Sequence, residues 1–551
     1  MSNSRNFVVL ALCFAFAFTF TACNKGDNEN IDPVSLIGGD GIFSIPFDTQ
    51  GEVFVMMWAG SGEFLRDIGR RDISPEDIRA SSDAGVIAVA KEFNKHFPNI
   101  TINFYGRTGG DSSDGISWDQ YRENVRMEHG SYPDVFAVSK LVSDVMRGIA
   151  ADLSIFSDDP MYQAMNPTIM DLMTIDERLF GLPQYMIPWG IFVNRGLADR
   201  ENIDIPPINW NINQFFQFAN NSRANDFYGG MQTLWVIADS GTEDMSRLLA
   251  NRGANGQPFV RINSEATRNI LGMLPQMNPH GVWRQNSEGN ISSEFMDEGG
   301  WWGPRFFVRN MLLTHDSDPW HFLDLANPEW NGNVLTDWDI YPRPSTNYVG
   351  NHVGIVLDPM AIRNYAMDDG NPVLSPSEYE QLTVSWEFAK FFAGDTRAWE
   401  ARANQMYQAG DTMRSALNAS FPFVTGQAFH DQMDIWFTAQ GREALADPNR
   451  FPGFHRVIEI FLDGEFAAYS DKTIPSNYTF EGESRAILIE WNNKWSADYV
   501  GAGDGEPHWL DELFARLPGW EVEFNKRFES AFAELSEAVE RLYPPQQRGG
   551  Q

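Results

Sequence analysis

The chain has 551 residues, 43% of them hydrophobic and eighteen of them tryptophan, which is enough apolar material for more than one domain. Its formal net charge is −34, and the acidic residues are scattered along the chain rather than gathered in tails. This composition argues against a nucleic-acid partner, because phosphate binding needs clustered lysine and arginine. We attribute the acidity to solubility rather than to a cationic ligand.

The N-terminus has the pattern of a secretory signal. Arg5 precedes an apolar stretch over residues 7–20, which is too short to span a bilayer. Thr21-Ala22-Cys23 follows and resembles a bacterial lipobox, at which cleavage would leave Cys23 as a lipid-modified, palmitate-bearing N-terminus. An uncleaved anchor with an incidental cysteine is the alternative. We predict a signal peptide over 1–22, a polar tether over 23–41, and a protein anchored on the extracytoplasmic side of the cell membrane.

The first part of the body has the pattern of parallel strand–helix–strand units. Residues 52–58 form a buried apolar run, Asp83 begins an amphipathic helix that Pro98 stops, and residues 100–104 alternate as a second strand. A helix over 118–128 and a strand over 133–138 repeat the unit. Parallel pairing through right-handed crossovers follows, so this region is α/β.

Later segments predict a second lobe and more than one crossing between lobes. Residues 182–194 and 337–357 have extended patterns, with a helical, aromatic region opening after Leu197 between them. Residues 377–394 are helical, and the remainder to Tyr543 is mostly amphipathic helix. Two α/β lobes with several crossings make a hinged cleft.

An ordered series of short motifs carries a family resemblance. It consists of the lipobox, Ala90-Lys91-Glu92-Phe93-Asn94, Pro133-Asp134-Val135-Phe136, Ala151-Asp152-Leu153-Ser154, Gly181-Leu182-Pro183, Phe192-Val193-Asn194 and Pro342-Arg343-Pro344. Each motif is degenerate, and the specificity lies in their order and spacing. Together they resemble the family 1 extracellular solute-binding proteins of ABC importers, which include maltose-binding-like proteins.

The resemblance implies a type 2 periplasmic-binding-protein-like fold, in which hinge strands join two α/β lobes around a central ligand cleft. The chain should cross between lobes near 190–194 and again near 339–344. The implied boundaries are 42–192 and 342–394 for lobe 1, and 193–341 and 395–545 for lobe 2. An insertion over 64–82 and a longer C-terminal region depart from the common members, which leaves the ligand class open.

The resemblance also implies where ligand-binding residues lie. The implied cleft positions are Trp58, Ser61, Glu63, Ser139, Lys140, Tyr185, Trp189, Trp301 and Trp302. Aromatic rings can stack on the flat face of a sugar while carboxylates and amides bind its hydroxyls, so Trp235 is a further candidate. Gly299-Gly300-Trp301-Trp302-Gly303-Pro304 is the strongest local pattern, whereas Trp386, Trp399 and Trp436 lie on helical patterns typical of a core.

The sequence contains few motifs typical of enzymes or metal sites. The nine histidines form no His-Glu-x-x-His pair, and a cleaved chain keeps one cysteine, which excludes a zinc cluster and an internal disulfide. Asp111 to Gly115 lacks the ligand pattern of a calcium loop, although a structural calcium stays open. Gly110-Asp111-Ser112 resembles an esterase motif with the wrong spacing of partners.

We therefore predict a monomeric binding protein without catalytic residues, cofactor or metal site, which delivers a small polar ligand, a sugar or oligosaccharide, to the permease of an ABC importer. A cell-surface glycan hydrolase that uses paired carboxylates is the alternative. A structural or adhesive surface lipoprotein is a third hypothesis, and it would have no saturable small ligand.

Overall fold

A computed structural model describes fifteen stretches of the chain. They are 32–57, 64–74, 81–106, 117–223, 226–230, 261–273, 276, 307, 309–315, 337–347, 349–367, 370–409, 412–439, 442–468 and 508–544.

The strands are β1 (Gly51–Met57), β2 (Phe64–Leu65), β3 (Ile100–Gly106), β4 (Val135–Ala137), β5 (Thr174–Ile175), β6 (Arg178–Leu179), β7 (Leu182–Trp189), β8 (Ile191–Val193), β9 (Tyr228–Gly230), β10 (Leu312–His315), β11 (Asp339–Tyr341), β12 (Val353–Ile362), β13 (Met406–Ala409), β14 (Thr412–Ser415) and β15 (Phe466–Ala468). The α-helices are α1 (Ser81–His96), α2 (Trp118–His129), α3 (Leu141–Met146), α4 (Pro160–Ala164), α5 (Pro167–Asp171), α6 (Arg195–Glu201), α7 (Ile212–Ala219), α10 (Glu265–Leu271), α15 (Pro376–Gly394), α16 (Thr396–Asn404), α17 (Gly426–Thr438), α18 (Pro452–Leu462) and α20 (His508–Leu542). Short 3₁₀ helices are η1 (Pro33–Leu36), η2 (Asp40–Ile42), η4 (Leu153–Phe156), η8 (Tyr365–Met367) and η9 (Glu443–Ala446).

The larger sheet has seven strands in the order β15-β12-β4-β1-β3-β2, with β7 also paired to β12. Strand β1 runs parallel to both β3 and β4, as the strand–helix–strand pattern predicts. Helix α1 begins at Ser81, so Asp83 lies in its first turn rather than before it. Helix α2 is capped by Ser117 and ends before Gly130, whose φ of 82° suits a residue without a side chain.

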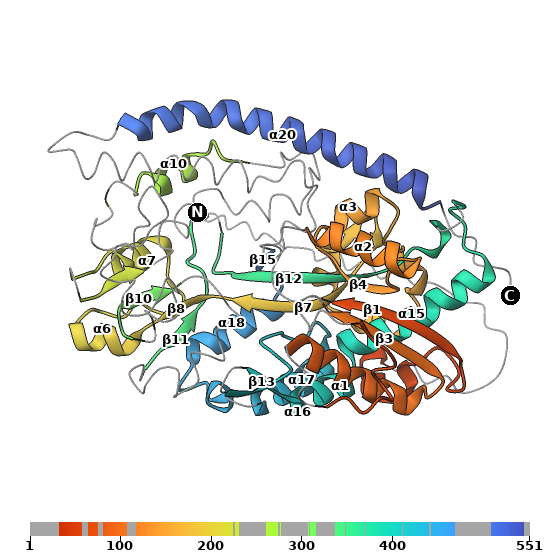
Figure 1. The fold of residues 1–551 in the computed structure, drawn as a ribbon. Coiled ribbons are helices and arrows are strands. Elements are labelled where there is room, and N and C mark those ends of the chain that lie inside the picture. Colours follow the sequence, from red (N-terminus) through yellow and green to blue (C-terminus); the bar gives the residue numbers. More distant parts are fainter. Residues whose placement is uncertain are drawn as a thin grey trace, which may run out of the picture.

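The smaller sheet has four strands in the order β11-β8-β10-β9. Its central strand β8 is antiparallel to both β10 and β11. Apolar residues of α6, α7 and α10, such as Phe215 and Ile270, form a core with strands of this sheet, and Trp210 before α7 joins that core. Figure 1 shows this lobe on the left and the seven-stranded sheet to the right. The predicted two-lobed α/β architecture is confirmed.

Two passages connect the sheets. Strand β7 in the larger sheet continues into β8 in the smaller one through Gly190, and β11 in the smaller sheet leads to β12 in the larger one. The sequence predicts passages near 190–194 and 339–344, and the structure has them at Gly190 and between Tyr341 and Val353. Since β8 pairs with β11, the two passages leave the smaller sheet side by side (Figure 1).

The helices after residue 394 are distributed differently from the sequence-based boundaries, which assign 395–545 to lobe 2. Helices α16, α17 and α18 contribute to the core of the larger sheet, through Trp399, Phe429 and Phe454 among others. Strand β15 also joins the larger sheet. Their amphipathic patterns fix which face is buried but not the sheet on which it packs. Helix α20 lies along both lobes (Figure 1).

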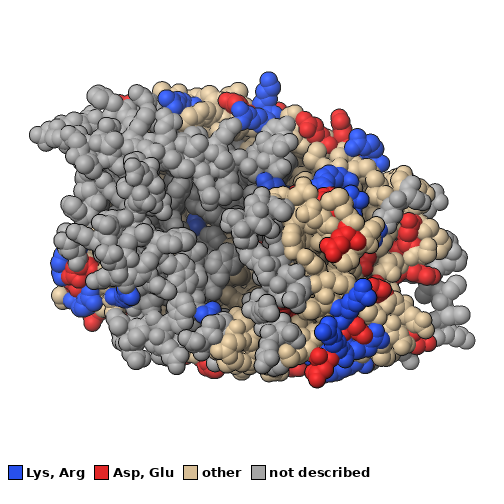
Figure 2. All heavy atoms as spheres, viewed as in Figure 1, with Lys and Arg blue, Asp and Glu red and all other residues tan. Residues whose placement is uncertain are grey.

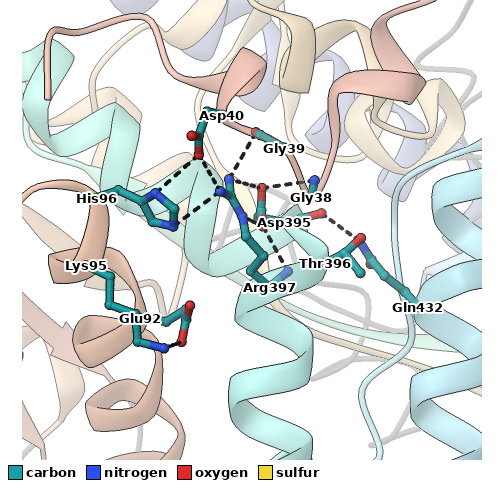
Figure 3. Close-up of polar contacts among 11 residues, drawn as sticks. Gly38, Gly39, Asp40, Glu92, Lys95, His96, Asp395, Thr396, Arg397 and Gln432 are labelled. Carbon is teal, nitrogen blue, oxygen red and sulfur yellow. Dashed lines mark hydrogen bonds and ion pairs between the residues drawn. The ribbon is translucent and has the colours of Figure 1, made fainter.

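The segment from Asp32 packs on lobe 1, although the sequence predicts a tether to residue 41. Ile42 is fully buried in the core of lobe 1. Figure 3 shows Asp40 beside His96 of α1 and Arg397 of α16, with the Arg397 Nη1 donating to an Asp40 Oδ1 2.9 Å away. Burial and Arg397 lower the pKa of His96. Residues 32–42 therefore belong to the folded body, whereas the sequence-based boundary assigns residues up to 41 to the tether.

Candidate functional site

One edge of the larger sheet collects the segments from which a binding site can be built. Strands β1, β3 and β4 are parallel, and β7 runs in the same direction as β4 because both are antiparallel to β12. Their carboxyl ends at Met57, Gly106, Ala137 and Trp189 therefore point to the same side. Ligands of open α/β sheets bind outside such carboxyl ends.

Two of the predicted cleft residues follow β4 at this edge. The Ser139 hydroxyl donates a 2.9 Å hydrogen bond to Asp119 Oδ1 of α2. Lys140 is half-buried at the position before α3, where it has no side-chain cap bond to the helix. The structure thus brings Ser139 and Lys140 to the carboxyl edge, with the serine already engaged by an acid.

Tyr185 lies on β7 opposite Asp358 of β12 and is half-buried. Burial raises the pKa of its hydroxyl, while Gln184 and the cation of Arg402 oppose that shift. Tyr407 of β13 and Asp83 of α1 also act on it electrostatically. Residues from three other elements, α1, β13 and α16, therefore act electrostatically on Tyr185.

Two buried arginines that the sequence did not point to are associated with this region: Arg402 acts on Tyr185, and Arg442 interacts electrostatically with Tyr407. Both guanidinium groups are buried, and both stack on indoles, Arg402 at 4.9 Å from the Trp399 ring and Arg442 at 4.6 Å from the Trp436 ring. Within the described ranges neither forms an ion pair with a carboxylate. Burial lowers the pKa of Arg402 to about 10 and that of Arg442 to about 9, opposed by Tyr185 and by Glu443 and Tyr407 respectively.

No local motif could have revealed this cluster, because Asp83, Tyr185, Arg402 and Arg442 are far apart in sequence. The two buried guanidinium groups contribute positive potential, and the half-buried Tyr185 carries a hydroxyl. A ligand with carboxylate or hydroxyl groups could be recognised by that hydroxyl and favoured by that potential.

The passages between the lobes are tightly fitted. A Cβ on Gly190 would lie 2.0 Å from the backbone oxygen of Tyr341, so only glycine allows the two passages to approach this closely. Asp339, fully buried, accepts hydrogen bonds from the backbone N–H groups of Gly453 at 2.8 Å and Phe454 at 3.1 Å. It thereby joins the beginning of α18, on lobe 1, to β11.

Arg195 completes this junction. Its guanidinium lies 3.2 Å from Asp339 Oδ2 and donates to the backbone oxygen of Arg450 at 2.7 Å. Burial raises the pKa of Asp339, and its backbone hydrogen bonds and Arg195 oppose the shift. The base of the space between the lobes is therefore a connected polar junction.

Most of the predicted ligand-binding residues lie outside the described residues. They are Trp58, Ser61, Glu63, Trp235, Trp301 and Trp302, together with the lipidation candidate Cys23. For Trp189 the backbone at the end of β7 is described but the side chain is not. Trp386, Trp399 and Trp436 are buried in the core, as predicted.

The described surface carries charges of both signs. Figure 2 shows Lys and Arg interspersed with Asp and Glu over the described part of this face. Among the described residues no group of three or more His, Cys, Asp or Glu is arranged to hold a metal ion. No helix in the described ranges is long and apolar enough to cross a membrane.

The part of the chain that contains α1, β3, β4 and the first passage matches the sequence model of a known family. Residues 79–256 match the family described as bacterial extracellular solute-binding protein. This match agrees with the family resemblance that the motif series predicts. No protein with a curated description matches this chain in sequence.

Solved structures of solute-binding proteins share the fold. An ABC substrate-binding protein from Listeria monocytogenes, in complex with cycloalternan, superimposes with a TM-score of 0.52 at 15% identity, covering 87% of this chain and all of the other. A sugar transporter from Rhizobium etli in an open conformation gives a TM-score of 0.50 at 14% identity, over 89% and 99% of the two chains. A chitin oligosaccharide binding protein gives 0.50 at 12% identity, over 88% and 99%. At these identities the likeness concerns the fold.

Proposed function

We propose that this solute-binding protein captures a carbohydrate between its two lobes and delivers it to the permease of an ABC importer. The observation that carries the proposal is the match of residues 79–256 to the extracellular solute-binding family, in a chain whose two sheets are joined by two adjacent passages. Of the similar structures named above, one is in complex with cycloalternan and another is described as a chitin oligosaccharide binding protein. Binding without chemistry is the activity typical of this family, and the glycan hydrolase is the alternative.

The ligand class can be narrowed by the Tyr185 cluster. Arg402 and Arg442 are buried without an ion pair within the described ranges, and Arg402 acts electrostatically on Tyr185 of β7. The positive potential of buried arginines would favour an acidic sugar beside Tyr185, whereas a neutral oligosaccharide would use the tyrosine hydroxyl alone. A uronate-bearing oligosaccharide is therefore the second candidate ligand, beside neutral oligosaccharides.

Thermal-shift screening tests the proposal directly. A ligand that binds only the folded state raises the unfolding midpoint in proportion to its concentration over Kd. The panel contains neutral α- and β-linked oligosaccharides, their uronate counterparts, and short peptides. A saturable shift with a carbohydrate supports the proposal, and a shift with peptides alone contradicts it. Chromatography of the same mixtures separates binder from hydrolase, since the binding protein leaves each glycan intact.

Paired tryptophan variants test the predicted cleft. If Trp301 and Trp302 stack on sugar, replacing the ligand-facing one with alanine removes about 1 to 3 kcal/mol of binding, roughly a ten- to hundredfold loss of affinity. The control is Trp386→Ala, which empties a core position instead. Loss of stability in both Trp301→Ala and Trp302→Ala, with binding unchanged in the protein that stays folded, would place the site elsewhere.

We propose that Cys23 anchors the protein in the membrane. The spacing of nine residues to Asp32 reaches at most about 32 Å when fully extended, which would hold lobe 1 close to the bilayer. Cys23→Ala should leave unprocessed precursor or release the protein from the membrane fraction. Normal processing of the wild-type chain without any lipid label would contradict the anchor.

A further inference from the structure

Helix α20 carries one continuous buried stripe along most of its length. The buried residues are Leu517, Phe524, Phe528, Ala531, Leu535, Ala538 and Val539. From Phe524 to Ala538 they recur at alternating intervals of four and three, so they lie on one face of the helix. At 35 residues the helix is about 52 Å long. A single helix face is therefore covered over a distance comparable to a small domain.

The first half of this stripe belongs to lobe 2. Leu517, Phe524 and Phe528 lie in the same core as Trp210 and Phe215 of the smaller lobe. Polar contacts hold the same half: Glu521 Oε2 accepts from the backbone N–H groups of residues 262 and 263, at 2.8 and 2.7 Å. The Arg268 Nη2 donates to the Phe514 backbone oxygen at 2.9 Å.

The second half belongs to lobe 1. Leu535 and Val539 lie in the large core of the seven-stranded sheet. Beyond the helix end, the Tyr543 hydroxyl is within hydrogen-bond distance of the backbone oxygens of Val145 at 3.1 Å and Ala150 at 2.8 Å. Between the two halves, Phe532 packs against both cores. One helix therefore packs against both lobes (Figure 1).

A hinge motion about Gly190 and the β11–β12 passage changes the angle between the lobes. Pro518 interrupts the hydrogen bonding near the beginning of α20, but the contacts from Phe524 to Val539 that reach both cores lie after it. A hydrogen-bonded helix bends little, so this stretch cannot follow both lobes through such a motion and keep its contacts with each of them. We propose that α20 is an inter-lobe strut that sets the resting angle between the lobes. Its contacts with each lobe form one seat, and one of the two seats must break when the lobes close on a ligand. The closure step rests on the proposed function, whereas the resting angle does not.

The experiment measures the angle directly in the absence of ligand. The full chain, with Cys13→Ser and Cys23→Ser to remove other thiols, carries spin labels at Met127→Cys on α2 of lobe 1 and Ile205→Cys of lobe 2, both exposed positions. Pulsed dipolar spectroscopy then gives the distribution of distances between the lobes.

Two variants loosen one seat each: Leu535→Ala with Tyr543→Phe on lobe 1, and Glu521→Ala on lobe 2. Either should broaden the distance distribution, by about twofold for the lobe 1 variant, because the hinge is then restrained at one end only. The matched control is Leu445→Ala, which removes a fully buried leucine of the lobe 1 core in η9.

The control should lower the unfolding midpoint like the lobe 1 variant while leaving the distribution as narrow as in the wild type. Distributions that stay as narrow as the wild type in both seat variants, with far-ultraviolet circular dichroism unchanged, would overturn the strut. The Glu521→Ala variant keeps the proposal testable if the lobe 1 variant fails to fold. Because no ligand is present, a failed ligand screen leaves this result unaffected.

Discussion

The two lobes are built from the chain in different ways. Lobe 1 takes its strands from both sides of the sequence, residues 51–189 and 353–468, whereas all the described strands of lobe 2 come from a single insertion, residues 191–341, whose first and last strands are paired. The described core of lobe 1 contains buried charge networks, including Lys390 with Asp159 and Glu387 and Arg122 with Asp144. The described apolar core of lobe 2 surrounds a single buried tryptophan, Trp210.

The difference indicates how the lobes depend on each other. Lobe 1 cannot complete its sheet until the chain has passed through lobe 2, because β12 lies between β4 and β15. The 191–341 segment of lobe 2 has adjacent ends and a core separate from that of lobe 1, to which α20 adds Leu517, Phe524 and Phe528. Adjacent ends and a separate core are properties of a unit that can fold alone. We therefore expect lobe 2 to be the more autonomous unit and α20 to couple the two.

The largest expected effect comes from emptying one buried tryptophan site in each lobe. Trp386 in lobe 1 stacks on Phe156 with ring centroids 4.7 Å apart, and Trp210 in lobe 2 donates through Nε1 to the Pro342 oxygen at 2.7 Å. Each substitution by alanine should cost about 3 to 5 kcal/mol through the cavity left behind.

Scanning calorimetry distinguishes the two tryptophan variants. If lobe 2 is autonomous, Trp210→Ala should produce a separate unfolding transition at lower temperature. Trp386→Ala should instead lower the midpoint temperature of the main transition. Phe437→Ala, at a partly buried position of lobe 1, serves as the control for a milder aromatic truncation. A single transition that both variants lower equally would mean that the lobes unfold as one unit.

How much of this architecture could be predicted varies by element. The strand–helix–strand pattern of residues 51–106 and the passage at Gly190 follow from apolar alternation, caps and glycine, all of which act locally. Helices α16 to α18 form where their periodicity indicates, yet their packing on lobe 1 could not be predicted. Periodicity shows that a face is buried without naming its partner.

The candidate site shows the same limit. Ser139 and Lys140 could be placed because they directly follow a strand of a parallel sheet, whose carboxyl edge is fixed by topology. The electrostatic environment of Tyr185 could not be predicted, since Asp83, Arg402 and Tyr407 act on it from three other elements. The charge of Arg402 becomes informative only once its burial is known.

The second prediction concerns the junction between the lobes. Gly190→Ala places a Cβ 2.0 Å from the Tyr341 backbone oxygen, which cannot move without shifting β11. We expect a loss of about 3 kcal/mol in the free energy of unfolding, the upper end for overpacking. Gly350→Ala is the control, since a Cβ there meets nothing within 4 Å. Equal unfolding midpoints in urea for the two variants would contradict the close approach of the passages.

The third prediction uses the charge network that lobe 1 contains. Glu387 shares Lys390 with Asp159, and burial raises the pKa of Glu387 to about 7, opposed by Lys390. Because the folded state holds the proton more tightly than the unfolded one, this stabilisation is fully present below about pH 4.5 and is lost as pH rises through about 7. The free energy of unfolding should therefore fall by about 2 kcal/mol from this group between pH 5 and 8.

Glu387→Gln resembles the protonated carboxyl and should remove that part of the pH dependence. Urea unfolding at a series of pH values checks this, with Glu378→Gln on the exposed part of the same helix as the control for a lost charge. A profile for Glu387→Gln that keeps the full slope of the wild type would show that the proton resides elsewhere.

The smallest expected effect compares the same local interaction in the two lobes. Helix α7 in lobe 2 and helix α15 in lobe 1 both begin with a capping box, formed by Asn211 with Gln214 and by Ser375 with Glu378. Asn211→Ala and Ser375→Ala each leave backbone N–H groups of the first turn without an acceptor, which costs about 1 kcal/mol. If the lobes unfold separately, Asn211→Ala should lower the midpoint of only the transition assigned to lobe 2 by Trp210→Ala, and Ser375→Ala should lower only that of the other transition.

Thr425→Ala is the control, because Thr425 precedes α17 without a side-chain cap bond. If Asn211→Ala lowered the stability of both transitions by the same free energy, the first turn of α7 would be coupled to the core of lobe 1. So small a local change could then be felt in lobe 1 only if lobe 2 did not unfold as a separate unit.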